Sequence, residues 1–336
     1  MVILLLPLVA AILFVDYFHP FDKSYHKTPV RPLQEQLYQR LSDAGLTGDE
    51  LATVGALTLG YKEDLDRELK RHFQASGAAH VLAVSGLHTG IIYGLLLWLF
   101  TLGGRFKPLY EHKWHRWLIS TVIIAAMWGY AWLTGMTPSV VRAVVMVTIF
   151  EIGRMAYRQA ISLNTVAAAA VLILLAHPQD LWSISFQLSF AATFAIVIFM
   201  SALGNNVYTL SRHSKVLSYL VSLILVSFAA QLGTLPITMF YFKQVSTYFL
   251  LANLLVLPLA SFLVPCGLIS IALGGSTIGV LFSKITWSLA WAMNHSVGWI
   301  ESLPGSTFPA HVNALMVAIY YLLLLLFCAI VLKKHD

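Results

Sequence analysis

Ser85 and His88 are the residues of this chain whose types and spacing first suggest chemistry. They lie three positions apart inside a strongly apolar segment, so both side chains project from one face if the segment is helical. A histidine beside a serine hydroxyl can act as its general base, as in hydrolases with a serine nucleophile. At membrane depth the same pair can instead line a hydrated path, which is the usual setting of an intramembrane histidine. A third interpretation is structural, with His88 hydrogen-bonded to a carbonyl of a neighbouring helix.

The hydrolase interpretation lacks two features that serine hydrolases use. No Asp or Glu lies nearby in the sequence to orient His88, and Ala83 occupies the first glycine position of the Gly-x-Ser-x-Gly pattern. The two cysteines, Cys266 and Cys328, lie in apolar runs and are expected to be buried free thiols. We therefore predict no catalytic residue, no cofactor and no metal site.

Arg142 is the least expected residue in the chain. It lies a few residues into an apolar run, in Thr-Pro-Ser-Val-Val-Arg-Ala, without an acidic neighbour in the sequence. An arginine within a membrane segment costs about 2.5–3.5 kcal/mol on insertion scales unless it is paired, hydrated or close to the interface. One hypothesis is that the side chain extends to the outer interface. The other is that it faces a hydrated path and meets an anion.

Further amide and hydroxyl side chains occur inside later apolar runs, at Gln187, Ser189, Gln231 and Asn253. Each alone could form an interhelical hydrogen bond worth about 0.6 kcal/mol. Together with Ser85, His88 and Arg142 they favour a single polar seam that extends over several spans. No carboxylate lies deep in a span between residues 80 and 303, since Glu151 is near the inner end of its own span. This argues against the carboxylate relay of an ion pump.

The elements that must position these residues are membrane helices. The chain has 336 residues, of which 58% are hydrophobic and 11% are charged, with a mean hydropathy of +0.77. Soluble domains contain about 25% charged residues. We predict an all-α, polytopic integral membrane helical bundle of about ten transmembrane helices, at residues 2–18, 80–102, 114–134, 139–157, 161–176, 182–203, 216–241, 247–273, 278–303 and 312–332.

Residues 19–79 form the one long polar stretch of the sequence. Charged residues alternate with Leu and Phe at helical spacing over 32–46 and 62–74, which predicts amphipathic helices on the membrane surface. Thr47 followed by Glu50 is a capping-box pattern that begins a helix.

We predict two parts of the chain. The first, residues 1–79, comprises the first transmembrane helix and an external amphipathic segment, and the second is a transmembrane domain at 80–336. Within this domain Pro258 and Pro265 favour a break of the span 247–273 into two half-helices.

The charges of the short loops predict the orientation of the spans. One alternate set of loops carries nearly all of the Lys and Arg, and the other set contains only Lys243. The positive-inside rule places the basic set in the cytoplasm. Both termini and the turn near residues 274–277 are then cytoplasmic, and residues 19–79 lie outside. The same rule accounts for the formal net charge of +6, which is therefore no specific sign of nucleic-acid binding.

The segment His80-Val-Leu-Ala-Val-Ser-Gly-Leu-His88 strongly resembles the His-Leu-Leu-Ala-(Val/Ile)-Ser-Gly-Leu-His signature of ComEC-type competence proteins. We assign His80, Gly86 and Gly90 of this region to packing, because small residues let backbones approach closely. Other stretches resemble the same family in its order: Gly60 before an acidic helix, Arg142-Ala-Val-Val-Met, Asn164 before an alanine run, Ala176-His-Pro178, Ser185-Phe-Gln-Leu-Ser-Phe190, Gln231-Leu-Gly-Thr-Leu-Pro236, and Ala252-Asn253 to Pro258.

The resemblance implies a multi-pass channel of the bacterial inner membrane that passes single-stranded DNA into the cytoplasm during natural transformation. Its implied partners are single-stranded DNA, membrane lipid, an external DNA receptor, a cytoplasmic DNA translocase and a second copy of the chain. A sparsely charged path suits this role, because a densely basic one would hold phosphates too tightly to let them move on. The residues expected to line it are Ser85, His88, Arg142, Gln187, Ser189, Gln231 and Asn253.

Two domains of full-length relatives are not found in this sequence. Residues 19–79 are too few for an OB-fold with its tethers, and the His-x-His-x-Asp-His motif of metallo-β-lactamase-like domains does not occur. The main alternative function is a secondary transporter of small solutes, which the expected broken helix would suit. An inverted repeat and an ion site at the membrane midplane would identify such a transporter.

Overall fold

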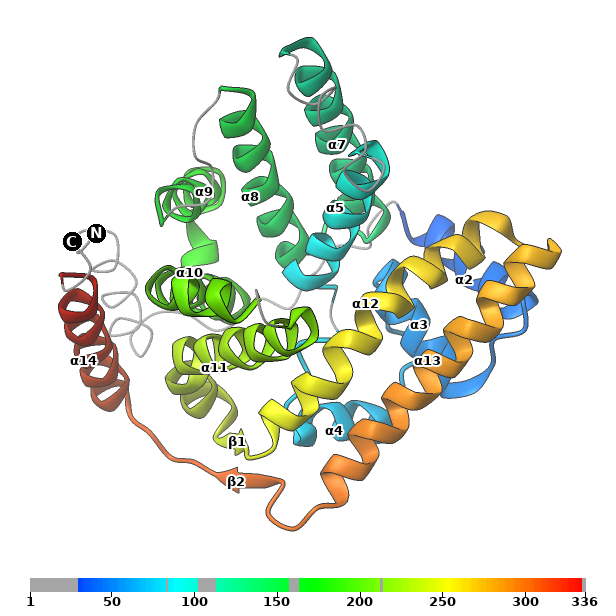
Figure 1. Cartoon of the computed structure of the whole chain (residues 1–336). Helices are drawn as coiled ribbons and strands as arrows, with labels where there is room; N and C mark the ends of the chain where they lie inside the picture. Colours follow the sequence, from blue (N-terminus) through cyan, green and yellow to red (C-terminus); the bar gives the residue numbers. More distant parts are fainter. Residues whose placement is uncertain (1–29, 83, 102–112, 157–162, 212–213, 334–336) are drawn as a thin grey trace. The chain divides into compact units, whose positions relative to one another are not determined.

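The computed structural model of the chain describes residues 30–82, 84–101, 113–156, 163–211 and 214–333 (Figure 1). The predicted all-α class is confirmed, since the described residues contain helices, connecting turns and two strands of three residues. The elements are α2 (Arg31–Asp43), α3 (Gly48–Leu59), α4 (Arg67–Ser76), α5 (Gly86–Thr101), α7 (Lys113–Leu133), α8 (Pro138–Met155), α9 (Leu163–Ala176), η2 (Pro178–Trp182), α10 (Ile184–Ser211), α11 (Lys215–Phe242), β1 (Gln244–Ser246), α12 (Phe249–Leu273), α13 (Thr277–Ser302), β2 (Thr307–Pro309) and α14 (Ala314–Lys333).

Every predicted span from residue 80 onward corresponds to a helix, and the first predicted span, 2–18, lies outside the described residues. The predicted membrane character is confirmed by four described helices that are long and apolar enough to cross a bilayer. Among the described residues, α5, α9 and residues 314–324 of α14 are also apolar, but each is shorter than a typical transmembrane helix. The number of about ten transmembrane helices therefore stays a prediction. The four helices are Trp114–Leu133, Ile184–Ser201, Lys215–Phe242 and Phe249–Leu273.

The described chain forms two compact units. We call residues 30–156 and 255–306 the signature unit, because it contains the His80–His88 segment, and residues 163–254 and 307–333 the hairpin unit. Helix α12 contributes its first turns to the hairpin unit and the rest to the signature unit. The predicted division of the chain into residues 1–79 and 80–336 stays a prediction.

In the signature unit, α5, α7 and α8 lie side by side (Figure 1). The predicted amphipathic helices are present as α2 and α4, and α4 packs against α13 of the protein. Leu69 and Phe73 form the buried side of α4. Its polar side carries Arg71 and His72, which contact the Glu301 carboxylate at 3.0 and 3.1 Å.

Helix α3 belongs to the core of the signature unit. All of its residues from Leu51 to Leu59 are buried, and it packs against α13. A Cβ atom on Gly267 of α12 would lie 2.8 Å from Thr58 Cγ2, so this glycine permits a close approach of α12 to α3. The helix begins directly after Thr47, as the capping-box pattern predicts, although the Thr47 side chain makes no capping hydrogen bond.

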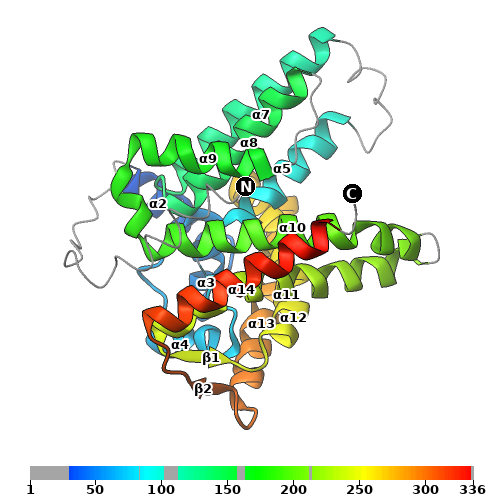
Figure 2. The same ribbon diagram turned by 90° about the vertical axis from the view of Figure 1, so that its left-hand side faces the viewer.

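The hairpin unit is built on α10 and α11, which pack along their length (Figure 2). A Cβ atom on Gly233 of α11 would lie 2.5 Å from the Ala191 carbonyl oxygen, so only glycine fits there. Pro236 lies inside α11 and has no N–H to bond the carbonyl of residue 232. The hydroxyl of Tyr320 on α14 donates to that carbonyl at 2.9 Å, and Tyr321 donates to the carbonyl of residue 233 at 2.7 Å.

The strands of the hairpin unit form a small antiparallel pair, with Val245 opposite Phe308. This pair joins the end of α11 to the segment before α14. The predicted break at Pro258 and Pro265 is wrong, because α12 is continuous through both prolines. A broken helix in an apolar setting would leave more backbone groups without partners than two missing N–H groups do.

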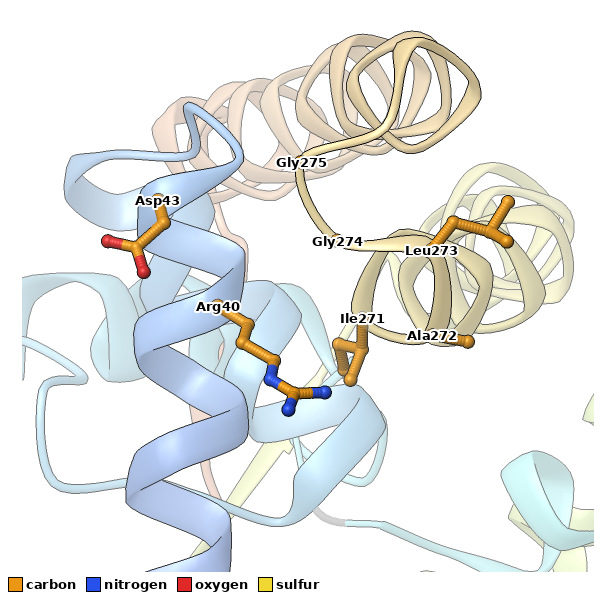
Figure 3. A pocket seen from close by; sticks show the side chains of 7 residues that line it. All are labelled: Arg40, Asp43, Ile271, Ala272, Leu273, Gly274 and Gly275. Carbon is orange, nitrogen blue, oxygen red and sulfur yellow. The ribbon is translucent and has the colours of Figure 1, made fainter.

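The end of α2 and the turn between α12 and α13 line a hollow of about 250 Å³ (Figure 3). Arg40 and Asp43 of α2 lie on one side, and residues 271–275 lie on the other. The Arg40 side chain points toward Ile271, near the C-terminal end of α12, where a positive charge is favourable. The loop charges predict that α2 lies outside the membrane and that the turn between α12 and α13 lies in the cytoplasm. Because residues of both line one hollow, they must lie on the same side, so these two predictions cannot both hold.

Candidate functional site

The start of α5 brings Ser85 and His88 into contact. The helix begins at Gly86, six residues later than predicted, and the Ser85 carbonyl accepts its first hydrogen bond from the N–H of Thr89 at 3.1 Å. His88 Nδ1 accepts the Ser85 N–H at 3.2 Å, and the Ser85 Oγ lies 3.1 Å from the same nitrogen. His88 thus occupies the position of the Glu or Gln in a capping box and satisfies the backbone N–H of the residue before the helix.

The other ring nitrogen of His88 has different surroundings. The side chain is fully buried, and in the described part of the chain Nε2 has no hydrogen-bond partner. Because Nδ1 accepts a backbone N–H, the neutral ring carries its proton on Nε2. A buried donor left without a partner costs about 1–3 kcal/mol. The groups that act electrostatically on this ring are His80 and Lys62.

The N-terminus of α8 lies at the same end of the signature unit as the N-terminus of α5. The Ser139 hydroxyl donates to the Val84 carbonyl at 2.6 Å, and a Cβ atom on Gly86 would touch the Ala143 Cβ at 3.8 Å. Thr137 precedes α8, and Pro138 at the first helical position has the backbone angle that a helix start requires. The two helices therefore run in the same direction and present their N-termini together.

The C-terminal ends of α3 and α7 meet close to this place. Gly60, with φ of +74°, ends α3, and a Cβ atom there would lie 3.2 Å from the Thr134 carbonyl and 3.5 Å from Val84. The amide of Gln34 donates to the last carbonyls of both helices, at 2.8 Å for Leu59 and 3.0 Å for Leu133. The negative ends of α3 and α7 are thereby capped by a neutral side chain.

Arg142 lies one turn into α8 and is 2% exposed, so its guanidinium is enclosed by protein and does not extend to a surface. This excludes the interface hypothesis within the described structure. A buried guanidinium keeps its charge, because arginine cannot lose its proton in a protein.

The opposite end of α8 holds a polar cluster that sequence reasoning missed. Glu151 is fully buried and accepts hydrogen bonds from the hydroxyls of Tyr93 on α5 at 2.5 Å and Ser120 on α7 at 2.6 Å. Arg154 bonds the same carboxylate at 3.0 Å and the Tyr93 hydroxyl at 3.1 Å. The available signal was that Glu151 and Arg154 are three apart and share a helix face.

Arg142 and Glu151 are nine residues apart, which is two and a half helical turns, so they project from opposite faces of α8. The positive group of Arg142 is therefore separate from the Glu151 cluster.

The other predicted path residues belong to the hairpin unit. Gln187 on α10 is fully buried and donates to the Leu181 carbonyl at 3.2 Å, and Asn253 on α12 is 8% exposed. Among the described residues, Gln187 Oε1 and Asn253 Oδ1 have no hydrogen-bond partner. Ser189 and Gln231 are half-buried. The structure thus groups three path residues in one unit and four in the other.

The three residues assigned to packing all lie in the signature unit, and they differ in what surrounds them. Gly86 contacts α8 through Ala143, as described above, whereas a Cβ atom on Gly90 would meet nothing within 4 Å. His80 lies in the turns before α5 and outside the helix. In the described part of the chain, no three His, Cys, Asp or Glu side chains are grouped closely enough to hold a metal ion.

Comparison with known proteins identifies relatives over most of the sequence. ComE operon protein 3 of Bacillus subtilis (strain 168) is 29% identical over 279 residues, which cover 81% of this chain and 32% of that protein. Recombination protein 2 of Haemophilus influenzae is 28% identical over 242 residues, covering 70% of this chain and 29% of that protein. The uncharacterized protein YcaI of Escherichia coli (strain K12) is 30% identical over 215 residues, 63% of this chain and 28% of that protein.

The chain thus spans about a third of the length of these curated relatives. No solved structure matches it. A family model described as Competence protein matches residues 57–334, a range that includes α5, α8, the described hairpin unit and the signature unit from the end of α3 onward. This helical membrane protein therefore belongs to the Competence protein family.

Proposed function

We propose that this chain forms, or contributes to, the conduit through which single-stranded DNA crosses the bacterial inner membrane during natural transformation. The family supports a role in DNA uptake. The observation that carries the finer proposal is the enclosure of the Arg142 cation in the same unit as the buried, half-satisfied His88. Polar groups of this kind at membrane depth mark paths for polar substrates.

The proposed path is lined by Ser85, His88 and Arg142 in the signature unit and by Gln187, Ser189, Gln231 and Asn253 in the hairpin unit. Few of these groups are charged. Passing DNA requires contacts to phosphates that are weak enough to be exchanged, and amide and hydroxyl groups tolerate any base.

The proposal includes the partners that the family resemblance implies. These are an external DNA receptor, a cytoplasmic DNA translocase and a second copy of the chain. Both termini are proposed to be cytoplasmic.

The test is uptake of labelled DNA by cells that take it up naturally, scored as the fraction protected from external nuclease. The gene is deleted and then restored as wild type, Arg142→Gln, or the control Lys284→Gln, which removes an exposed cation of α13. We expect deletion to abolish protection without reducing DNA bound at the surface. Arg142→Gln should restore little protection at normal protein level, and Lys284→Gln should restore it fully. Unchanged protection after deletion would refute the proposal.

A second candidate function is hydrolysis by Ser85, which the 3.1 Å distance between Ser85 Oγ and His88 Nδ1 favours. Against it, Nδ1 already accepts the Ser85 N–H, and in the described residues no carboxylate bonds Nε2. A fluorophosphonate probe that labels the wild type but not Ser85→Ala would establish this function. The small-solute transporter loses its main support, because α12 is unbroken.

A further inference from the structure

Two helix N-termini face the same region of the signature unit. The Ser139–Val84 hydrogen bond and the contact of Gly86 with Ala143 hold the starts of α5 and α8 together. The start of α5 presents backbone N–H groups without helical partners. At the start of α8, Pro138 has no N–H. The N–H groups of Val140 and Val141 bond the Thr137 carbonyl, so this end contributes mainly the positive end of its helix dipole. Paired N-termini therefore concentrate donors and positive potential at one place.

Two basic groups contribute to this place. Lys62 acts electrostatically on His88, and Arg142 lies one turn into α8. The acidic residues next to Lys62 are engaged elsewhere: Glu63 forms an ion pair with Arg31, and Asp64 interacts with the Tyr38 hydroxyl. The carbonyls at the ends of α3 and α7 are capped by the Gln34 amide, as described above.

An independent observation points to a missing ligand. The fully buried Nε2 of His88 has no hydrogen-bond partner in the described structure, although its other nitrogen fixes the ring at the first turn of α5. The hydroxyls of Thr137, directly before α8, and Tyr130, near the end of α7, are also without partners among the described residues. Gly86, at the start of α5, is exposed, so solvent reaches this helix start.

We propose that the joined N-termini of α5 and α8, with His88 and Lys62, form a binding site for a phosphate-type anion. Within the proposed function, on which the identity of the ligand rests, that anion is a backbone phosphate of the DNA strand. The site holds one phosphate through N–H groups and a small number of cations, so the contact is independent of base sequence. It is therefore suited to hold a strand briefly while it advances.

The variants that test the site keep its helix cap. Gln and Glu at the third helical position both accept the N–H of the residue before the helix, so His88→Gln and His88→Glu preserve the bond to Ser85. Glu adds a negative charge where the anion would bind. Lys62→Gln removes a cation from the site, and Lys284→Gln is the matched control on α13.

The first measurement is binding of inorganic pyrophosphate to the full chain in lipid nanodiscs by calorimetry. We expect His88→Glu to abolish binding, His88→Gln and Lys62→Gln to weaken it about tenfold each, and Lys284→Gln to leave it unchanged. Thermal unfolding of each variant shows that the fold is retained. Equal binding by all folded variants would overturn the proposal.

The second measurement separates this site from the proposed function. Binding of the oligonucleotide dT12 is measured at several salt concentrations, where each phosphate contact contributes a slope of about 0.7 for a single strand. Loss of about one contact in Lys62→Gln and His88→Glu supports a DNA phosphate as the ligand. If dT12 binds with an unchanged slope in these variants, the site is refuted while DNA binding stands. If pyrophosphate binds at the site but dT12 does not bind at all, the anion site stands and the DNA conduit is refuted.

Discussion

The two ends of α8 contain polar groups of opposite character. At the Glu151 end, the buried carboxylate has two hydroxyl donors and an arginine, all from α5, α7 and α8 themselves. At the other end, next to Arg142, the buried His88 Nε2 and two hydroxyls are without partners in the described structure. A satisfied buried network fixes how helices pack, whereas buried groups without partners cost stability and are retained where a ligand uses them. The Glu151 end therefore has the features of a structural contact, and the other end is the one that we propose to bind a ligand.

Breaking the Glu151 cluster should produce the largest change in stability. Glu151→Ala removes the fully buried acceptor of the Tyr93 and Ser120 hydroxyls and of the half-buried Arg154. A buried donor left without a partner costs about 1–3 kcal/mol, so the total loss should be several kcal/mol. Glu301→Ala is the control, because that carboxylate pairs with Arg71, whose side chain is 67% exposed, and an exposed pair is worth about 1 kcal/mol or less. Thermal and denaturant unfolding in detergent measures both. Equal losses of stability in the two variants would show that the Glu151 cluster stabilises the fold no more than the Glu301 ion pair does.

Replacing Arg142 should instead separate stability from activity. Arg142→Met keeps the bulk of a buried side chain, so its effect on unfolding should be smaller than that of Glu151→Ala. Loss of a charge-assisted contact to a phosphate is worth about 1.5–3 kcal/mol, or roughly ten- to hundredfold in uptake. Nuclease-protected DNA and unfolding temperature are measured on the same variant. A variant that unfolds early and loses uptake in proportion would place Arg142 with Glu151 as a structural residue.

His88 should show a smaller effect that depends on the replacement. His88→Ala removes the acceptor of the Ser85 N–H and should cost about 1 kcal/mol, as a lost helix cap does. His88→Gln restores that acceptor and should unfold like the wild type. Hydrogen exchange at the first turn of α5 reports the same difference locally. If both variants are equally unstable, packing of the His88 ring stabilises the helix start more than its hydrogen bond to the Ser85 N–H does.

The smallest expected change is one of accessibility, and it shows whether α2 and the turn between α12 and α13 lie on the same side of the membrane. Asp43→Cys and Gly275→Cys line the same hollow at exposed positions, and Gly275 has open space for a side chain. A membrane-impermeant maleimide should label both from one side of oriented vesicles, without a change in stability. Labelling of the two cysteines from opposite sides would support the prediction from loop charges, with α2 outside and the turn between α12 and α13 in the cytoplasm.

Local pattern was sufficient for the helices. Apolar runs of span length gave the positions of α7 through α14 within a few residues, except that α10 continues to Ser211, eight residues past its predicted end. A membrane helix satisfies its own backbone and needs only its own sequence to be apolar. The capping-box pattern at Thr47 marked a helix start for an equally local reason. The signature residues were visible too, although the helix starts at Gly86 because Ser85 and His88 form its cap.

What tertiary structure decided was which polar group finds a partner. Tyr93 and Glu151 are 58 residues apart, and Tyr320 and Leu232 are 88 apart, so no sequence window contains both members of either pair. Composition alone therefore classed Glu151 as a peripheral acid and Pro258 as a helix break, whereas packing made the first a buried anchor and left α12 whole. Helix formation depends on neighbours in the chain, and the satisfaction of a buried charge depends on neighbours in space.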